Sequence, residues 1–83
     1  MRNGTKGSER IVIDERVMVG KPIIKGTRIT VEAVIRKLAE GITTKELLDE
    51  YPSLDAKDVM AALDYAAGLI ANEEIIPKET IYA

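Results

Sequence analysis

The chain has 83 residues, a length typical of one small domain. A domain of this size buries only about 60–65% of the surface that it exposes when unfolded, so we expect a partner or a second copy to stabilise it. Apolar residues make up 46% and charged residues 31% of the chain, a composition that excludes an intrinsically disordered protein. Cysteine and histidine are both absent, which removes disulfides, thiolate ligands, and the usual metal ligand and general base.

These absences predict that the chain is not an enzyme and holds neither a cofactor nor a metal. The adjacent carboxylates Asp14–Glu15 and Asp49–Glu50 point apart and do not form a catalytic pair. No uncharged apolar run is long enough to span a membrane, and the polar opening lacks the apolar segment of a signal peptide. We therefore expect a cytoplasmic protein with no membrane contact.

Charge is divided unevenly along the chain. Residues 1–37 carry nine basic and four acidic side chains, a net charge of +5, whereas residues 38–83 carry three basic and ten acidic ones, a net charge of −7. Such asymmetry favours contact between the N-terminal half and a polyanion. Solvated surface charge is the alternative interpretation.

The pattern predicts three regions: a flexible tail at 1–9, a single domain at 10–74, and an apolar C-terminal tail at 75–83. Within the domain, β-branched runs predict short strands at Ile11–Ile13 and Val17–Val19. A third extended segment is expected at Pro22–Ile24, where the proline suits an edge strand.

Three helices are predicted after the strands. The first runs over 31–40, with Thr30 as its N-cap and Gly41 as the residue that ends it. The second runs over 44–51, opened by a capping box that starts at Thr43 and ended by a proline. The third runs over 56–72, with Asp55 as its N-cap. This order predicts a mainly α helix-turn-helix bundle, although plain three-helix bundles share it.

The third helix is apolar on more than one side. Its expected core face consists of Val59, Leu63, Ala66 and Ile70, and a further apolar side consists of Met60, Ala67 and Ala71. Its first turns carry acids, which suit a DNA-reading helix poorly, so we interpret it as core plus dimer interface. The predicted homodimer interface comprises Ile11, Val12, Ile13, Met60 and Ala67.

The basic residues gather before the first helix, in the segment 20–29. Here Lys21, Lys25, Thr27 and Arg28 are the predicted DNA-binding residues, acting on phosphates. The segment contains neither a Walker loop nor a dinucleotide fingerprint. The alternative is a shaped turn in which Arg28 pairs with an acid such as Glu32.

Large apolar side chains also occur in the C-terminal tail. Ile75, Ile76, Ile81 and Tyr82 lie within these nine residues. Burial of such side chains is favourable, so the tail folds back on its own bundle, crosses to a second copy of the chain, or stays mobile until a toxin binds it. We predict that these four residues form a docking segment for a toxin.

Residues 11–70 resemble the domain-of-unknown-function family 433. The resemblance rests on the opening strand that ends in Asp14, the segment Gly20–Ile29 (GKPIIKGTRI), the turn Tyr51–Leu54 (YPSL), and the alanine-rich helix that follows. Members of this family look like small homeodomain-like helix-turn-helix proteins and are commonly called VapB-type antitoxins. Their genes often neighbour those of PIN-like ribonuclease toxins. The resemblance implies a dimeric DNA-binding autorepressor that acts on its own operator and neutralises such a toxin. A protein–protein interaction module without DNA binding is the alternative.

Overall fold

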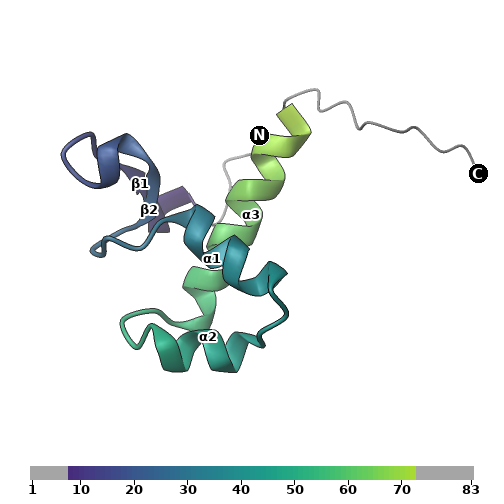
Figure 1. Cartoon of the computed structure of the whole chain (residues 1–83). Helices are drawn as coiled ribbons and strands as arrows, with labels where there is room; N and C mark the ends of the chain where they lie inside the picture. Colours follow the sequence, from purple (N-terminus) through teal and green to yellow (C-terminus); the bar gives the residue numbers. More distant parts are fainter. Residues whose placement is uncertain (1–7, 73–83) are drawn as a thin grey trace, which may run out of the picture.

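The computed structural model describes residues 8–72 of the chain. The predicted fold class is confirmed: three helices carry a short two-stranded antiparallel sheet at the N-terminal side (Figure 1). In chain order the elements are η1 (Ser8–Arg10), β1 (Ile11–Ile13), η2 (Met18–Gly20), β2 (Pro22–Ile24), α1 (Val31–Ala39), α2 (Thr44–Glu50) and α3 (Ala56–Asn72). Ser8 and Glu9, which the sequence assigns to the N-terminal tail, lie in the short 3-10 turn η1.

The sheet pairs β1 with β2 in antiparallel register, with Ile11 opposite Ile24. Both of these side chains are buried, because the sheet turns one face toward the helices. Ile23 makes an additional bridge to Thr30, so the outer side of β2 is held by the residues that enter α1. Two of the three predicted strands, at 11–13 and 22–24, therefore form.

The predicted strand at Val17–Val19 is wrong. The segment instead forms the turn η2, in which Met18, Val19 and Gly20 all have positive φ, at 51°, 57° and 78°. The β-branched side chains there favour a strand by propensity. Only eight residues separate β1 from β2, however, and they must reverse the chain direction between the two paired strands.

The helix boundaries follow the predicted caps closely. The Thr30 hydroxyl accepts a hydrogen bond from the Ala33 amide at 3.0 Å and opens α1, and Gly41, with φ of +100°, follows the helix end. A reciprocal capping box between Thr43 and Glu46 opens α2. These are local interactions, which explains why the sequence predicts them.

The core lies where the sheet meets all three helices. Its largest fully buried side chains are Ile24, Val34, Leu47 and Val59, contributed by β2, α1, α2 and α3 respectively. Figure 1 shows α1 crossing α3 near the middle of the molecule, with α2 beside the start of α3. Each element thus supplies part of a single core.

The core face that the sequence assigns to α3 is only partly correct. Val59 is buried, but Leu63 and Ile70 are exposed, the latter to 59%. The buried face consists instead of Asp58, Val59, Ala61 and Ala62, all in the first half of the helix. The second half of α3 rises past α1 in Figure 1 and has less of the bundle to pack against.

Among the helices of residues 8–72, none combines the length and the hydropathy that a membrane-spanning helix needs.

Candidate functional site

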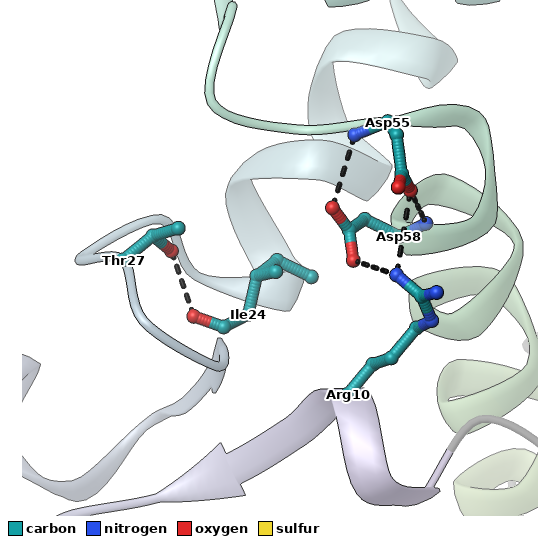
Figure 2. Close-up of polar contacts among 5 residues, drawn as sticks. All are labelled: Arg10, Ile24, Thr27, Asp55 and Asp58. Atoms are coloured by element: carbon teal, nitrogen blue, oxygen red, sulfur yellow. Dashed lines mark hydrogen bonds and ion pairs between the residues drawn. The ribbon is translucent and has the colours of Figure 1, made fainter.

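A polar junction ties the N-terminal segment to the start of α3 (Figure 2). Arg10 donates through Nη1 to Asp58 Oδ1 at 2.8 Å and lies 3.4 Å from Asp55 Oδ1. The two aspartates also cap the helix reciprocally: Asp55 Oδ1 accepts from the Asp58 amide at 2.9 Å, and Asp58 Oδ2 accepts from the Asp55 amide at 3.0 Å. The predicted N-cap at Asp55 is therefore confirmed.

The charges of this junction stabilise each other. The hydrogen bond from the Asp58 amide, followed by the field of Arg10, holds the pKa of Asp55 below its usual value. The hydrogen bond to Asp58 likewise raises the pKa of Arg10. The side chain of Asp58 is only 12% exposed. Two of the acids that argue against DNA contact at α3 are thus engaged within the protein itself.

The turn between β2 and α1 is built around Thr27. The Thr27 hydroxyl donates to the Ile24 carbonyl at 2.8 Å (Figure 2). The same hydroxyl accepts a hydrogen bond from the Ile29 amide at 3.0 Å. Gly26 has φ of +82°, a conformation that residues with a Cβ rarely adopt. These interactions define the backbone of the turn, and they occupy the hydroxyl that the sequence assigns to phosphate.

The cations of the segment Gly20–Ile29 fall into two groups. Lys21 pairs with Glu32 at 3.2 Å, and Glu32 also accepts from Arg36 at 2.9 Å; these two cations lower the pKa of Glu32, Arg36 more strongly. Lys25 and Arg28 are exposed, and neither has an ion pair within the described part of the chain. The pairing of Arg28 with Glu32, the alternative suggested by the sequence, is therefore wrong. Lys25 and Arg28 remain available to an external anion.

The residues predicted for the dimer interface differ in exposure. The Ile11 side chain is buried in this chain's own core and Val12 is half-buried, so β1 offers a second copy mainly its backbone edge and Ile13, which is 59% exposed. Met60, at 64% exposure, and Ala67 lie on the outer side of α3. The predicted toxin-binding residues Ile75, Ile76, Ile81 and Tyr82 lie outside the described residues.

An apolar groove of about 410 Å³ runs between α1, β2 and the second half of α3. Its lining residues are Pro22, Val31, Glu32, Ile35, Arg36, Tyr65, Ala66 and Leu69. Sequence reasoning missed both this groove and the Arg10 junction, because each joins residues that are far apart in the chain. Residues 8–72 contain no group of three or more acidic side chains placed to hold a metal ion.

The architecture and its open basic turn define a class of small three-helix domains with an N-terminal two-stranded sheet. The model of the family described as "Protein of unknown function (DUF433)" matches residues 11–66, and the chain belongs to this family. The match covers β1 through the part of α3 that packs in the core.

Similar proteins are known from several organisms. The crystal structure of a family member from Anabaena variabilis is similar at a TM-score of 0.69 and 37% identity, over 71% of this chain and 58% of that one. An uncharacterized protein of Archaeoglobus fulgidus is 68% identical over 28 residues, which are 34% of this chain and 78% of the relative. The uncharacterized protein y4eO of Sinorhizobium fredii is 36% identical over 50 residues, covering 60% of this chain but only 23% of that protein.

Proposed function

We propose that the chain is a dimeric, antitoxin-type DNA-binding protein that represses its own operon and neutralises a PIN-like ribonuclease toxin. The observation that carries the DNA-binding part is the pair of exposed cations, Lys25 and Arg28, on the turn before α1. Lys25 and Arg28 lie three residues apart on this turn, so both can contact phosphates of the same duplex.

The acidic start of α3 is the main objection to DNA binding. The Arg10 junction weakens this objection. Asp55 and Asp58 share the guanidinium of Arg10, so the three side chains together carry a net charge of −1 rather than −2. Lys57, exposed in the first turn of α3, brings the local sum to zero. The start of α3 therefore repels a phosphate backbone far less than its sequence suggests.

A gel-shift with the DNA upstream of the protein's own gene tests this proposal. We expect K25A/R28A to weaken binding to specific and unrelated duplexes by the same factor, because phosphate contacts carry no sequence information. A dimer with four such contacts should lose affinity with salt at a log–log slope of about −3 to −4. The control is K45A, which removes an exposed lysine from α2. An affinity that is unchanged in K25A/R28A contradicts the proposed site.

We further propose that the C-terminal segment 75–83 binds the toxin. This proposal is supported by the four large apolar side chains that this segment carries and by the family resemblance. Deleting 75–83 should leave the melting temperature unchanged and abolish co-purification with the product of the neighbouring toxin gene. A sharp drop in melting temperature instead places these residues in the core of this protein.

The second candidate function is an interaction module that binds another protein and no DNA. The exposed apolar side of α3 and the adjacent groove favour it, since contiguous apolar surface commonly marks a protein-binding site. Absence of any gel-shift at low salt, together with co-purification with the product of the neighbouring gene, supports this alternative over the first.

A further inference from the structure

The outer side of α3 carries an apolar seam with the spacing of a coiled coil. Its residues follow one another at intervals of four, three, four and three: Ala56, Met60, Leu63, Ala67 and Ile70. All five are exposed in the described structure, Met60 to 64% and Ile70 to 59%. This 3–4 spacing keeps apolar side chains in line along one helix and suits packing against a second helix. The alanines allow the two backbones to approach closely.

The two flanks of the seam differ in chemistry. One flank carries Lys57 and Asp64, seven residues apart, each directly after a seam residue. Both are exposed, and within residues 8–72 neither forms an ion pair with another side chain. The other flank carries Val59, which is buried, and Ala66, which is half-buried against the groove. The seam therefore has one charged flank and one apolar flank.

This asymmetry decides how a second copy of the helix can pack. In a parallel pair, the charged flank of each helix faces the apolar flank of the other, which leaves Lys57 and Asp64 without partners. In an antiparallel pair, charged flank faces charged flank and apolar flank faces apolar flank. The opposite signs of Lys57 and Asp64 then become complementary across a two-fold axis.

We propose that α3 packs antiparallel against α3 of a second copy, with Lys57 of each helix beside Asp64 of the other. In this register Met60 lies opposite Leu63, and Ala56 lies opposite Ala67. Ile70 reaches the turn that precedes α3 in the second copy, where Pro52 is exposed. A shift by one heptad places the two Asp64 side chains together, so charge selects the register. This inference rests on the dimer of the proposed function and specifies its interface.

The experiment measures the dimer dissociation constant of the full chain and its charge variants by sedimentation equilibrium. K57D and D64K each replace two attractive pairs with two repulsive ones, and each should raise the dissociation constant about 10- to 30-fold. An equimolar mixture of K57D with D64K should form a heterodimer of wild-type affinity, and the double variant K57D/D64K should form a homodimer of the same affinity. The matched controls K45D and D49K reverse exposed charges on α2 and should leave the constant unchanged.

Circular dichroism melts of each variant establish that the monomer fold is intact. A wild-type chain that sediments as a monomer at about 100 µM overturns the proposal. A mixture that fails to restore the dimer also overturns it, and so does a tighter dimer in D64N, which indicates the shifted register. A dimer that withstands both single reversals overturns this interface but leaves the proposed dimer and DNA contacts standing, because the gel-shift of K25A/R28A tests those separately.

Discussion

The junction at the start of α3 and the turn before α1 contain similar residues that have different roles. Both place arginine next to the N-terminus of a helix, where the backbone amides favour negative charge. At α3 the chain supplies its own anions, Asp55 and Asp58, which cap the helix and neutralise Arg10 (Figure 2). At α1 the cap is the neutral hydroxyl of Thr30, and Arg28 has no anionic partner among residues 8–72. An arginine at a helix start therefore stabilises the fold when its anion is internal, and it remains open to a ligand when the chain supplies no anion.

Removing the carboxylate at the junction should give the largest loss of stability. We expect Asp58→Ala to lower the free energy of unfolding by about 2–3 kcal/mol, because it removes a helix-capping bond, leaves the Asp55 amide without its acceptor, and leaves Arg10 with only its longer contact to Asp55. Urea unfolding measures this loss. The control Asp49→Ala, which removes an exposed carboxylate from α2, should change the free energy by less than about 0.5 kcal/mol. Equal effects of the two substitutions contradict a structural role for the junction.

The turn before α1 should depend on its glycine rather than on its charges. We expect Gly26→Ala to destabilise the protein by about 1 kcal/mol, since φ of +82° strains a residue with a Cβ although no atom lies within 4 Å of the added methyl group. The matched control is Gly68→Ala in α3, where φ is not positive and the methyl group also meets open space. That substitution should stabilise the helix by about 0.5–1 kcal/mol. Changes of the same sign in both variants contradict this interpretation.

The turn η2 contrasts with Gly26, because it places a β-branched residue in the left-handed region. Val19 has φ of 57° and is 93% exposed, so it bears conformational strain with little packing in return. Val19→Asn should raise the free energy of unfolding by about 0.5–1 kcal/mol, because asparagine tolerates this conformation. Thermal melts of the two proteins test the gain. A lower melting temperature in the variant indicates that the valine side chain makes a stabilising contact.

The smallest expected effect is the dependence of the junction on pH. Because the pKa of Asp55 is lower in the folded chain than its usual value, the stabilisation is present above about pH 4 and is lost as the pH falls through the folded pKa. The difference in melting temperature between wild type and Asp55→Asn should therefore shrink between pH 6 and about pH 3. A difference that stays constant over this range shows that the charge of Asp55 does not contribute.

The helices of this protein are largely determined by its sequence. Thr30, Thr43 and Gly41 act on backbone groups three or four residues away, so the pattern of residues alone predicts where α1 and α2 begin and where α1 ends. The segment Gly20–Ile29 is likewise recognisable by its glycines and cations. Sequence reasoning correctly predicted the features that depend on residues close together in the chain.

Tertiary structure decided the features that depend on distant partners. It made the segment Val17–Val19 a turn, because the chain must reverse between two paired strands, whatever the β propensity of its residues. It chose which side of the nearly all-apolar α3 is buried, since the bundle covers only the first half of that helix. It also joined Arg10 to Asp58, 48 residues away, and left Arg28 open. Periodicity identifies an apolar side or a charge, but only the folded chain determines what lies opposite each one.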